Sequence, residues 1–124
     1  MNIQVKLLLS AALFGSVSLA QANGDIERGQ QLYKNRCAAC HSLDYNGVGP
    51  AHKGVFGRMA GQANSYTYSA ALKTSKVVWT EQTLNLWLAD PEKLIPGQTM
   101  GISIPDAAER ADLIAYMKKA MSPK

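Results

Sequence analysis

The sequence predicts one small all-α domain, with about four to five helices joined by long loops. Apolar residues recur at helical spacing in several segments, and a residue suited to cap a helix precedes most of them. The alternating apolar and polar runs that are typical of strands are almost absent. Glycine and proline gather between the periodic segments, and the length of 124 residues suits a single small domain.

The first 22 residues are predicted to be a cleaved secretory signal peptide, so that the domain itself spans residues 23–124. Lys6 is followed by an uncharged apolar run over residues 7–19 and then by Ala20-Gln21-Ala22, an A-x-A cleavage pattern. The alternative is a membrane span, but the run has thirteen residues, whereas a span needs about twenty. We therefore expect export to the periplasm, without stable insertion into a membrane.

The first helix of the domain is expected to begin after Asp25 and to run up to the cysteines. Its apolar face consists of Ile26, Gly29, Leu32 and Tyr33. Residues 44–57 follow, and they are rich in turn formers, namely Asn46-Gly47, Gly49-Pro50, Gly54 and Gly57. This density predicts a long loop, a feature that is uncommon in a compact domain unless the loop has a function.

Three further helices are expected in the second half of the chain. A short helix is predicted over residues 69–73, and Thr80 is suited to cap the next helix, which Pro91 ends or restarts. Residues 95–101 contain a proline and two glycines and are predicted to form a loop, which we call the methionine loop. Asp106 then caps the last helix, whose apolar positions are Leu113, Ile114, Tyr116 and Met117.

The most informative motif is Cys37-Ala38-Ala39-Cys40-His41, which is the attachment pattern of c-type haem. Each thiol adds to one vinyl group of the porphyrin, and the two-residue gap matches the spacing of the two vinyls. His41 is then placed to serve as the proximal ligand of the iron. Loops that wrap around one covalent haem would also explain the length of the glycine-rich segments.

The two cysteines also suit two other kinds of site. A thiol oxidoreductase would use the same C-x-x-C spacing, but it needs a βαβ context that this sequence does not show. A zinc site would have to recruit His41 and His52, the two histidines of the chain. His41 adjoins Cys40, whereas a zinc finger separates its cysteine and histidine pairs by about twelve residues.

The charge of the chain excludes one class of partner. Without Lys6, the 13 basic residues fall to 12 against 9 acidic residues, which is a net charge of +3 for residues 23–124. No basic stripe or block of like charges accompanies this small excess. We therefore expect no binding to nucleic acid.

Over residues 24–121 the chain resembles the class I cytochromes c, the soluble monohaem type related to the mitochondrial protein. The matching stretches occur in the same order and at similar spacing: 24–33, 49–58, 66–72, Trp79-Thr80, 95–100 and 112–116. The resemblance implies the small cytochrome c fold wrapped around one covalent haem c, attached through Cys37 and Cys40. It also implies that Met100 is the sixth ligand of the iron, opposite His41.

The choice of Met100 agrees with its surroundings in the sequence. Met117 and Met121 belong to the predicted last helix, and Met59 follows Arg58 directly, so all three are expected to pack against the core or lie at the surface. Only Met100 stands in a loop with proline and glycine, and such a loop is able to bend a side chain onto a metal.

The resemblance also assigns an environment to the haem. The backbone carbonyl of Pro50 would hold the second nitrogen of His41. Arg58, Tyr68 and Trp79 would face the haem propionates, because a buried carboxylate needs partners. Trp87 stands near the methionine sulfur, where the mitochondrial type has a tyrosine, and an indole donates a hydrogen bond but accepts none.

The chain departs from the family at other positions as well. His52 replaces an apolar residue that touches the haem, and we expect it to be a partly exposed loop histidine. Glu92 and Thr99 stand where the mitochondrial protein has lysines, and only Arg36 and Lys93 remain of the basic ring around the haem edge. Because complementary charge sets association rate and partner choice, we expect a less acidic partner and a weak dependence on salt.

The function implied by the resemblance is that of a one-electron carrier and not an enzyme. The carrier is expected to be a monomer that docks transiently with redox partner proteins at the haem edge. One alternative is the electron-accepting cytochrome subunit of a periplasmic dehydrogenase. Another is a ligand-binding or peroxidase-type haem protein with a labile sixth ligand.

Overall fold

The computed structural model describes residues 23–121, so the predicted signal peptide and its cleavage site lie outside the described residues. The described part contains five helices, which are α1 (Ile26–Arg36), α2 (Ala70–Thr74), α3 (Glu81–Ala89), α4 (Pro91–Leu94) and α5 (Ala107–Ala120). Residues 23–121 hold one isolated β-bridge, between Met59 and Val78, and no longer strand. The predicted all-α class is therefore confirmed.

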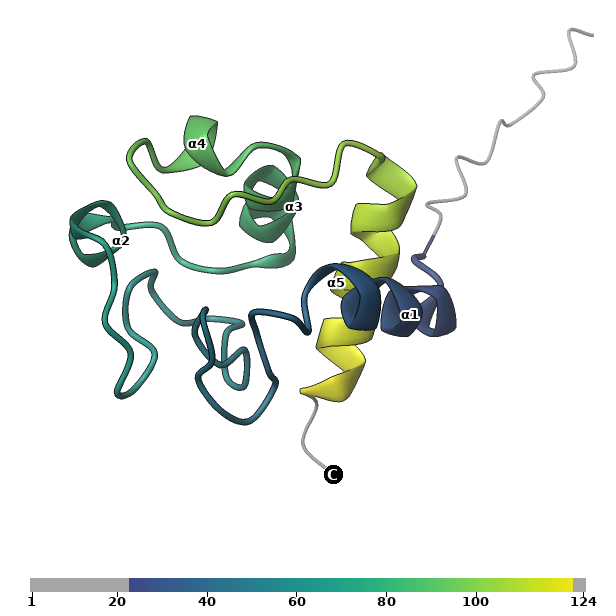
Figure 1. Ribbon diagram of the computed structural model, residues 1–124. Helices are drawn as coiled ribbons and strands as arrows, with labels where there is room; N and C mark the ends of the chain where they lie inside the picture. The colour runs from purple at the N-terminus through teal and green to yellow at the C-terminus, as the bar shows by residue number, and fades with distance from the viewer. Residues whose placement is uncertain (1–22, 122–124) are drawn as a thin grey trace, which may run out of the picture.

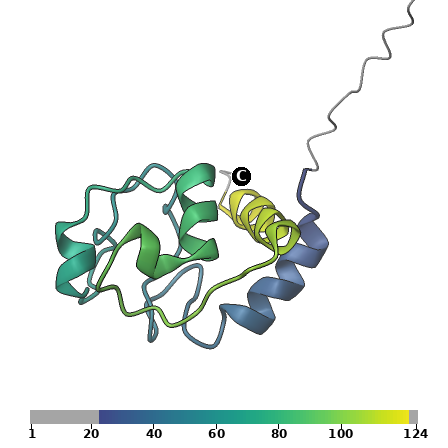
Figure 2. The same cartoon turned by 90° about the horizontal axis from the view of Figure 1, so that it is seen from above.

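Long loops connect the helices, except for α3 and α4, which are separated by Asp90 alone (Figure 1). Helices α1 and α5 lie side by side, as the view from above shows (Figure 2). Helix α3 contacts both α5 and α4. In Figure 1, the loops that follow α1 run along the bottom of the domain, and the segment that joins α4 to α5 runs above these loops.

The helix starts agree closely with the sequence. The side chains of Asp25, Thr80 and Asp106 each accept a hydrogen bond from a backbone N–H in the first turn of the helix that follows. The predicted short helix is shifted by one residue, because Ser69 is the N-cap of α2 and not its first helical residue. Pro91 occupies the first turn of α4 and thus restarts the helix.

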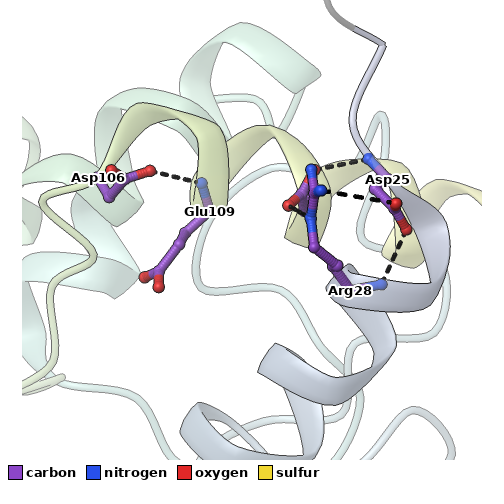
Figure 3. Close-up of polar contacts among 5 residues, drawn as sticks. Asp25, Arg28, Asp106 and Glu109 are labelled. Carbon is purple, nitrogen blue, oxygen red and sulfur yellow. Dashed lines mark hydrogen bonds and ion pairs between the residues drawn. The ribbon is translucent and has the colours of Figure 1, made fainter.

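The crossing of α1 and α5 depends on a close approach of the two backbones at Gly29. A Cβ atom at this position would lie 2.0 Å from the backbone oxygen of Asp112. Beside the crossing, Arg28 Nε donates to Asp112 Oδ2 over 2.9 Å, and the backbone N–H of Asp25 donates to Asp112 Oδ1 over 2.6 Å (Figure 3). Asp112 is 4% exposed, so these donors supply the partners that a buried carboxylate requires.

A second anchor on α5 holds the segment that follows the methionine loop. Arg110 donates from its guanidinium to the carbonyl oxygens of Ile104 and Pro105, over 2.8 and 2.7 Å. Its Nε atom donates to Asn85 Oδ1 on α3 over 2.8 Å. Ile104 is 1% exposed and its N–H donates to Leu88, so this irregular segment is fixed at both backbone and side chain.

No helix within residues 23–121 combines the length and the apolar character that crossing a membrane requires.

Candidate functional site

The cysteine–histidine motif lies in one tight turn at the end of α1. Cys37 is the C-cap of the helix, and its N–H donates to the carbonyl of Tyr33 over 2.9 Å. The N–H groups of Cys40 and His41 then both donate to the carbonyl of Cys37, over 3.1 and 2.9 Å. These bonds hold the two thiols and the imidazole at a fixed spacing on the end of a rigid helix.

The ring of His41 is held through one of its two nitrogens. Its Nδ1 atom lies 2.8 Å from the carbonyl oxygen of Pro50. Because a carbonyl oxygen only accepts, Nδ1 must carry the proton, and the lone pair of the neutral ring is then on Nε2. This is the tautomer in which an imidazole binds a metal through Nε2 with its other nitrogen fixed by a backbone carbonyl.

The loop before Pro50 is shaped to the His41 ring. A Cβ atom on Gly49 would lie 2.2 Å from His41 Cε1 and 2.6 Å from each ring nitrogen, so a side chain at this position would collide with the ring. The N–H of Gly49 donates to the carbonyl of Cys40 over 2.7 Å. In addition, Asn46 Oδ1 accepts from the N–H of Ala51 over 2.8 Å, which closes the loop around Pro50.

His52 lies against the His41 ring, a contact that the sequence reasoning missed. The two rings are stacked, with centroids 4.2 Å apart and planes inclined by 22°. His52 is half-buried, in agreement with the prediction. Burial, together with the nearby His41 and Arg58, lowers the pKa of His52 to about 3, so the ring is neutral at ordinary pH. The signal in the sequence was a histidine at a position where the family has an apolar residue against the haem.

Met100 lies half-buried at the end of the methionine loop and packs against the hydrophobic core. The carboxylate of Glu92 closes this loop, because Oε1 accepts from the N–H of Gly97 over 2.9 Å and Oε2 from Gln98 Nε2 over 3.4 Å. The sequence reasoning treated Glu92 only as a surface charge. Its role in closing the loop appears only when residues 92 and 97 are seen together in space.

The predicted haem-environment residues are held by three separate sets of contacts. Trp79 and Trp87 are buried and meet edge to face, with ring centroids 5.4 Å apart. The backbone N–H of Trp79, not its indole, donates to the backbone carbonyl of Arg58. Tyr68 packs instead beside Tyr66, and its hydroxyl accepts from the N–H of Ala63, so its own hydrogen remains available for donation. The guanidinium of Arg58 donates to the backbone carbonyls of residues 51 and 53.

The donor set of the described residues fits a haem better than a bare metal ion. Residues 23–121 contain no group of three or more His, Cys, Asp or Glu side chains that could hold a metal ion. A histidine with a free Nε2 and a methionine in a constrained loop are the axial donors of cytochromes c. Among the described residues, Gln98 Oε1 is buried without a hydrogen-bond partner.

The Cys37 thiol does not have the lowered pKa of a redox-active cysteine. Cys37 and Cys40 are not joined in a disulfide. Burial raises the pKa of the Cys37 thiol to about 11, with a further contribution from Cys40 and a partial offset by Arg36. Catalytic thiols have a lowered pKa, because the thiolate is the nucleophile. This environment therefore argues against the thiol oxidoreductase alternative.

Comparison with known proteins agrees with this geometry. Residues 26–120 match the family model for cytochrome c. The chain is 44% identical over 103 residues to cytochrome c of Sesamum indicum, covering 78% of this chain and 91% of that protein. It is 45% identical over 98 residues to cytochrome c 2.1 of Caenorhabditis elegans, covering 77% and 88%. Among solved structures, cytochrome cH from Methylobacterium extorquens superposes with a TM-score of 0.73 at 44% identity, covering 77% of this chain and 99% of that one.

Proposed function

Because the chain belongs to the cytochrome c family, whose members are electron-transfer proteins with one covalent haem c, we propose that it carries single electrons through an iron held by His41 and Met100. The observation that supports this most directly is the contact between His41 Nδ1 and the carbonyl of Pro50. It leaves Nε2 as the one basic nitrogen of the ring, on the atom that an iron ligand needs.

Cys37 and Cys40 are the proposed attachment points of the haem. In each thioether, the sulfur forms a bond to a vinyl carbon, and the thiol hydrogen ends on the neighbouring carbon. The hydrogen-bonded turn that follows Cys37 keeps both sulfurs next to His41, so attachment and ligation use the same rigid element. The haem supplies the one-electron couple, and the protein supplies its ligands and its surroundings.

The closed methionine loop favours a carrier over a ligand-binding or peroxidase-type protein. The Glu92 carboxylate holds the loop at Gly97, and Arg110 holds the segment that follows it. A methionine that is kept in place fills the sixth position of the iron, and a filled position leaves no site for a substrate. Trp79, Trp87, Tyr68 and Arg58 would surround the haem and lower its contact with water.

The proposed docking surface surrounds the haem edge. We assign to it the exposed residues 38–39, which lie between the two cysteines, and the exposed Ile102, two residues after Met100. Ile102 follows the methionine loop and is 46% exposed. Of the two basic residues that remain there, Arg36 lies 3.9 Å from Glu109, which offsets part of its charge. A surface of this kind supports a small, transient contact with a weakly charged redox partner, and we expect the carrier to be a monomer.

The proposed location is the periplasm, on the basis of residues 1–22. Lys6, the apolar run and Ala20-Gln21-Ala22 support a cleaved signal peptide over residues 1–22, a domain over 23–124 and a periplasmic protein. The test is to express the chain with its own leader and determine the mature N-terminus by mass spectrometry. A mature protein that starts at Asn23 and carries haem would support export, and an uncleaved chain would contradict it.

The ligand assignment is tested by optical spectroscopy of the exported protein, oxidised and then reduced with dithionite. We expect a low-spin spectrum with the far-red band of methionine-to-iron ligation, and its loss in Met100→Ala. Met59→Leu is the matched control, since Met59 lies outside the loop and should leave the band unchanged. A high-spin ferric spectrum, or CO binding to the native ferrous protein, would instead favour the ligand-binding or peroxidase alternative.

A further inference from the structure

His52 is the polar residue of the site that the proposed carrier function leaves without a role. Its ring lies parallel to that of His41 at stacking distance, with centroids 4.2 Å apart. A leucine or valine would fill the same space and would satisfy the packing equally well. An imidazole brings two nitrogens that must find partners once they are half-buried, so its presence calls for an explanation.

The partner of His52 is a buried tyrosine of α1. The hydroxyl of Tyr33 lies 2.8 Å from His52 Nδ1, and the two rings meet edge to face with centroids 5.7 Å apart. Tyr33 is itself 5% exposed and packs against Tyr116 of α5, with centroids 5.4 Å apart. The rigid crossing of α1 and α5 therefore determines where the His52 ring lies.

The hydrogen bond to Pro50 does not by itself determine the plane of the His41 ring. Carbonyl oxygens accept hydrogen bonds over a broad range of directions, so the ring could turn considerably while keeping this bond. A flat aromatic neighbour at stacking distance is more restrictive, because rotation would bring the ring edge into the stacked face. The His41 ring, which Gly49 also approaches closely, thus has one contact that fixes a nitrogen and a flat aromatic neighbour that limits its rotation.

We propose that His52 is a positioning residue that sets the plane of the His41 ring, with Tyr33 holding His52 in place. The inference rests on the proposed ligation of the iron by His41. The plane of an axial imidazole decides which iron orbital it overlaps, and hence how the unpaired electron of the ferric state is distributed over the porphyrin. The helix crossing is thereby linked to the electronic structure of the redox centre through two side chains.

The test compares three variants of the haem-loaded protein by proton NMR of the ferric state. His52→Leu keeps the volume and removes the flat ring, and Tyr33→Phe removes only the hydroxyl that holds it. Tyr116→Phe is the matched control, because it removes a hydroxyl from the same aromatic cluster and leaves the Tyr33–His52 contact intact. The hyperfine shifts of the four haem methyls report the plane of the axial ligands, and the reduction potential is measured in parallel.

We expect His52→Leu to change the pattern of methyl shifts most, Tyr33→Phe to change it in the same direction by less, and Tyr116→Phe to leave it unchanged. A pattern in His52→Leu and Tyr33→Phe that superimposes on that of the parent would overturn the proposal. If His52→Leu does not mature with haem, Tyr33→Phe decides on the same criterion. A parent spectrum without histidine ligation would refute the proposed function and this inference together, whereas a normal parent with unaltered variants would refute only the inference.

Discussion

Replacement of Gly29 by alanine tests how closely α1 and α5 must approach. A Cβ atom at this position would lie 2.0 Å from the Asp112 oxygen, 2.6 Å from the Asp112 carbonyl carbon and 2.8 Å from Tyr116 Cβ. Contacts of Cβ atoms below 3.0 Å essentially do not occur. The nearest neighbours are backbone atoms inside α5, which cannot rotate away, so the helices must separate by about 1 Å at their crossing.

The expected loss of stability is the difference between two effects. Overpacking against a rigid neighbour costs about 3 kcal/mol at the upper end of its usual range. Alanine recovers about 1 kcal/mol relative to glycine within a helix. We therefore expect Gly29→Ala to lower the free energy of unfolding by about 2 kcal/mol, which for a domain of this size is roughly 8–16 °C in Tm.

The assay is denaturant unfolding of the haem-loaded protein, followed by far-UV circular dichroism and by haem absorbance. Gln30→Ala is the control, because Gln30 is the next residue of α1 and is exposed, so alanine there should be neutral or slightly stabilising. The slope with denaturant should not change between the variants. Equal or higher stability of Gly29→Ala would refute the idea that the crossing depends on this close approach.

Three further predictions concern polar contacts. Glu92→Ala removes the acceptor for Gly97 N–H. We therefore expect the far-red methionine band to be lost at a lower pH in an alkaline titration, or at a lower denaturant concentration. Glu92→Gln keeps an acceptor and should behave nearly as the parent. The hydrogen bond from Arg28, above all, holds the pKa of Asp112 below its usual value. The stability that the ionised Asp112 contributes is present above its unfolded pKa and is lost as the pH falls through its folded pKa. Asp112→Asn should therefore be less stable than the parent near pH 7, and urea unfolding should show this difference shrinking below about pH 4. Arg110→Lys loses a fork of bonds to two backbone carbonyls beyond the methionine loop, and we expect a loss of about 1–2 kcal/mol in urea unfolding, with an unaltered stability contradicting this anchor.

Much of the fold could be predicted from residues that are close in the sequence. Asp25, Thr80 and Asp106 cap helices because each side chain accepts from the N–H three residues ahead, a contact that needs no tertiary structure. The one-residue shift at Ser69 is of the same local kind, since a cap and a first helical residue differ only in backbone angles. The haem motif is also local, since the chemistry of attachment sets the spacing of Cys37 and Cys40.

Loop contacts were harder to predict, because glycine and proline indicate where the chain turns and not where it returns. The role of Glu92 in closing the methionine loop depends on the exact path between residues 92 and 97. The stacking of His52 on His41 likewise depends on how the loop folds back after Pro50. Sequence reasoning identified His52 as unusual, but it could not identify its neighbours.

The sequence by itself determined the class of the fold, the helix starts and the residues proposed to bind and ligate the haem, because periodicity, capping and covalent spacing act over a few residues. The tertiary structure alone decided that Asp112 would hold Arg28, 84 positions away, that Arg110 would anchor the segment behind the methionine loop, and that His52 would lie against His41. These contacts arise only when helices and loops pack together. Partners that are distant in the chain are chosen by the shape and burial of the whole core, which no local pattern encodes.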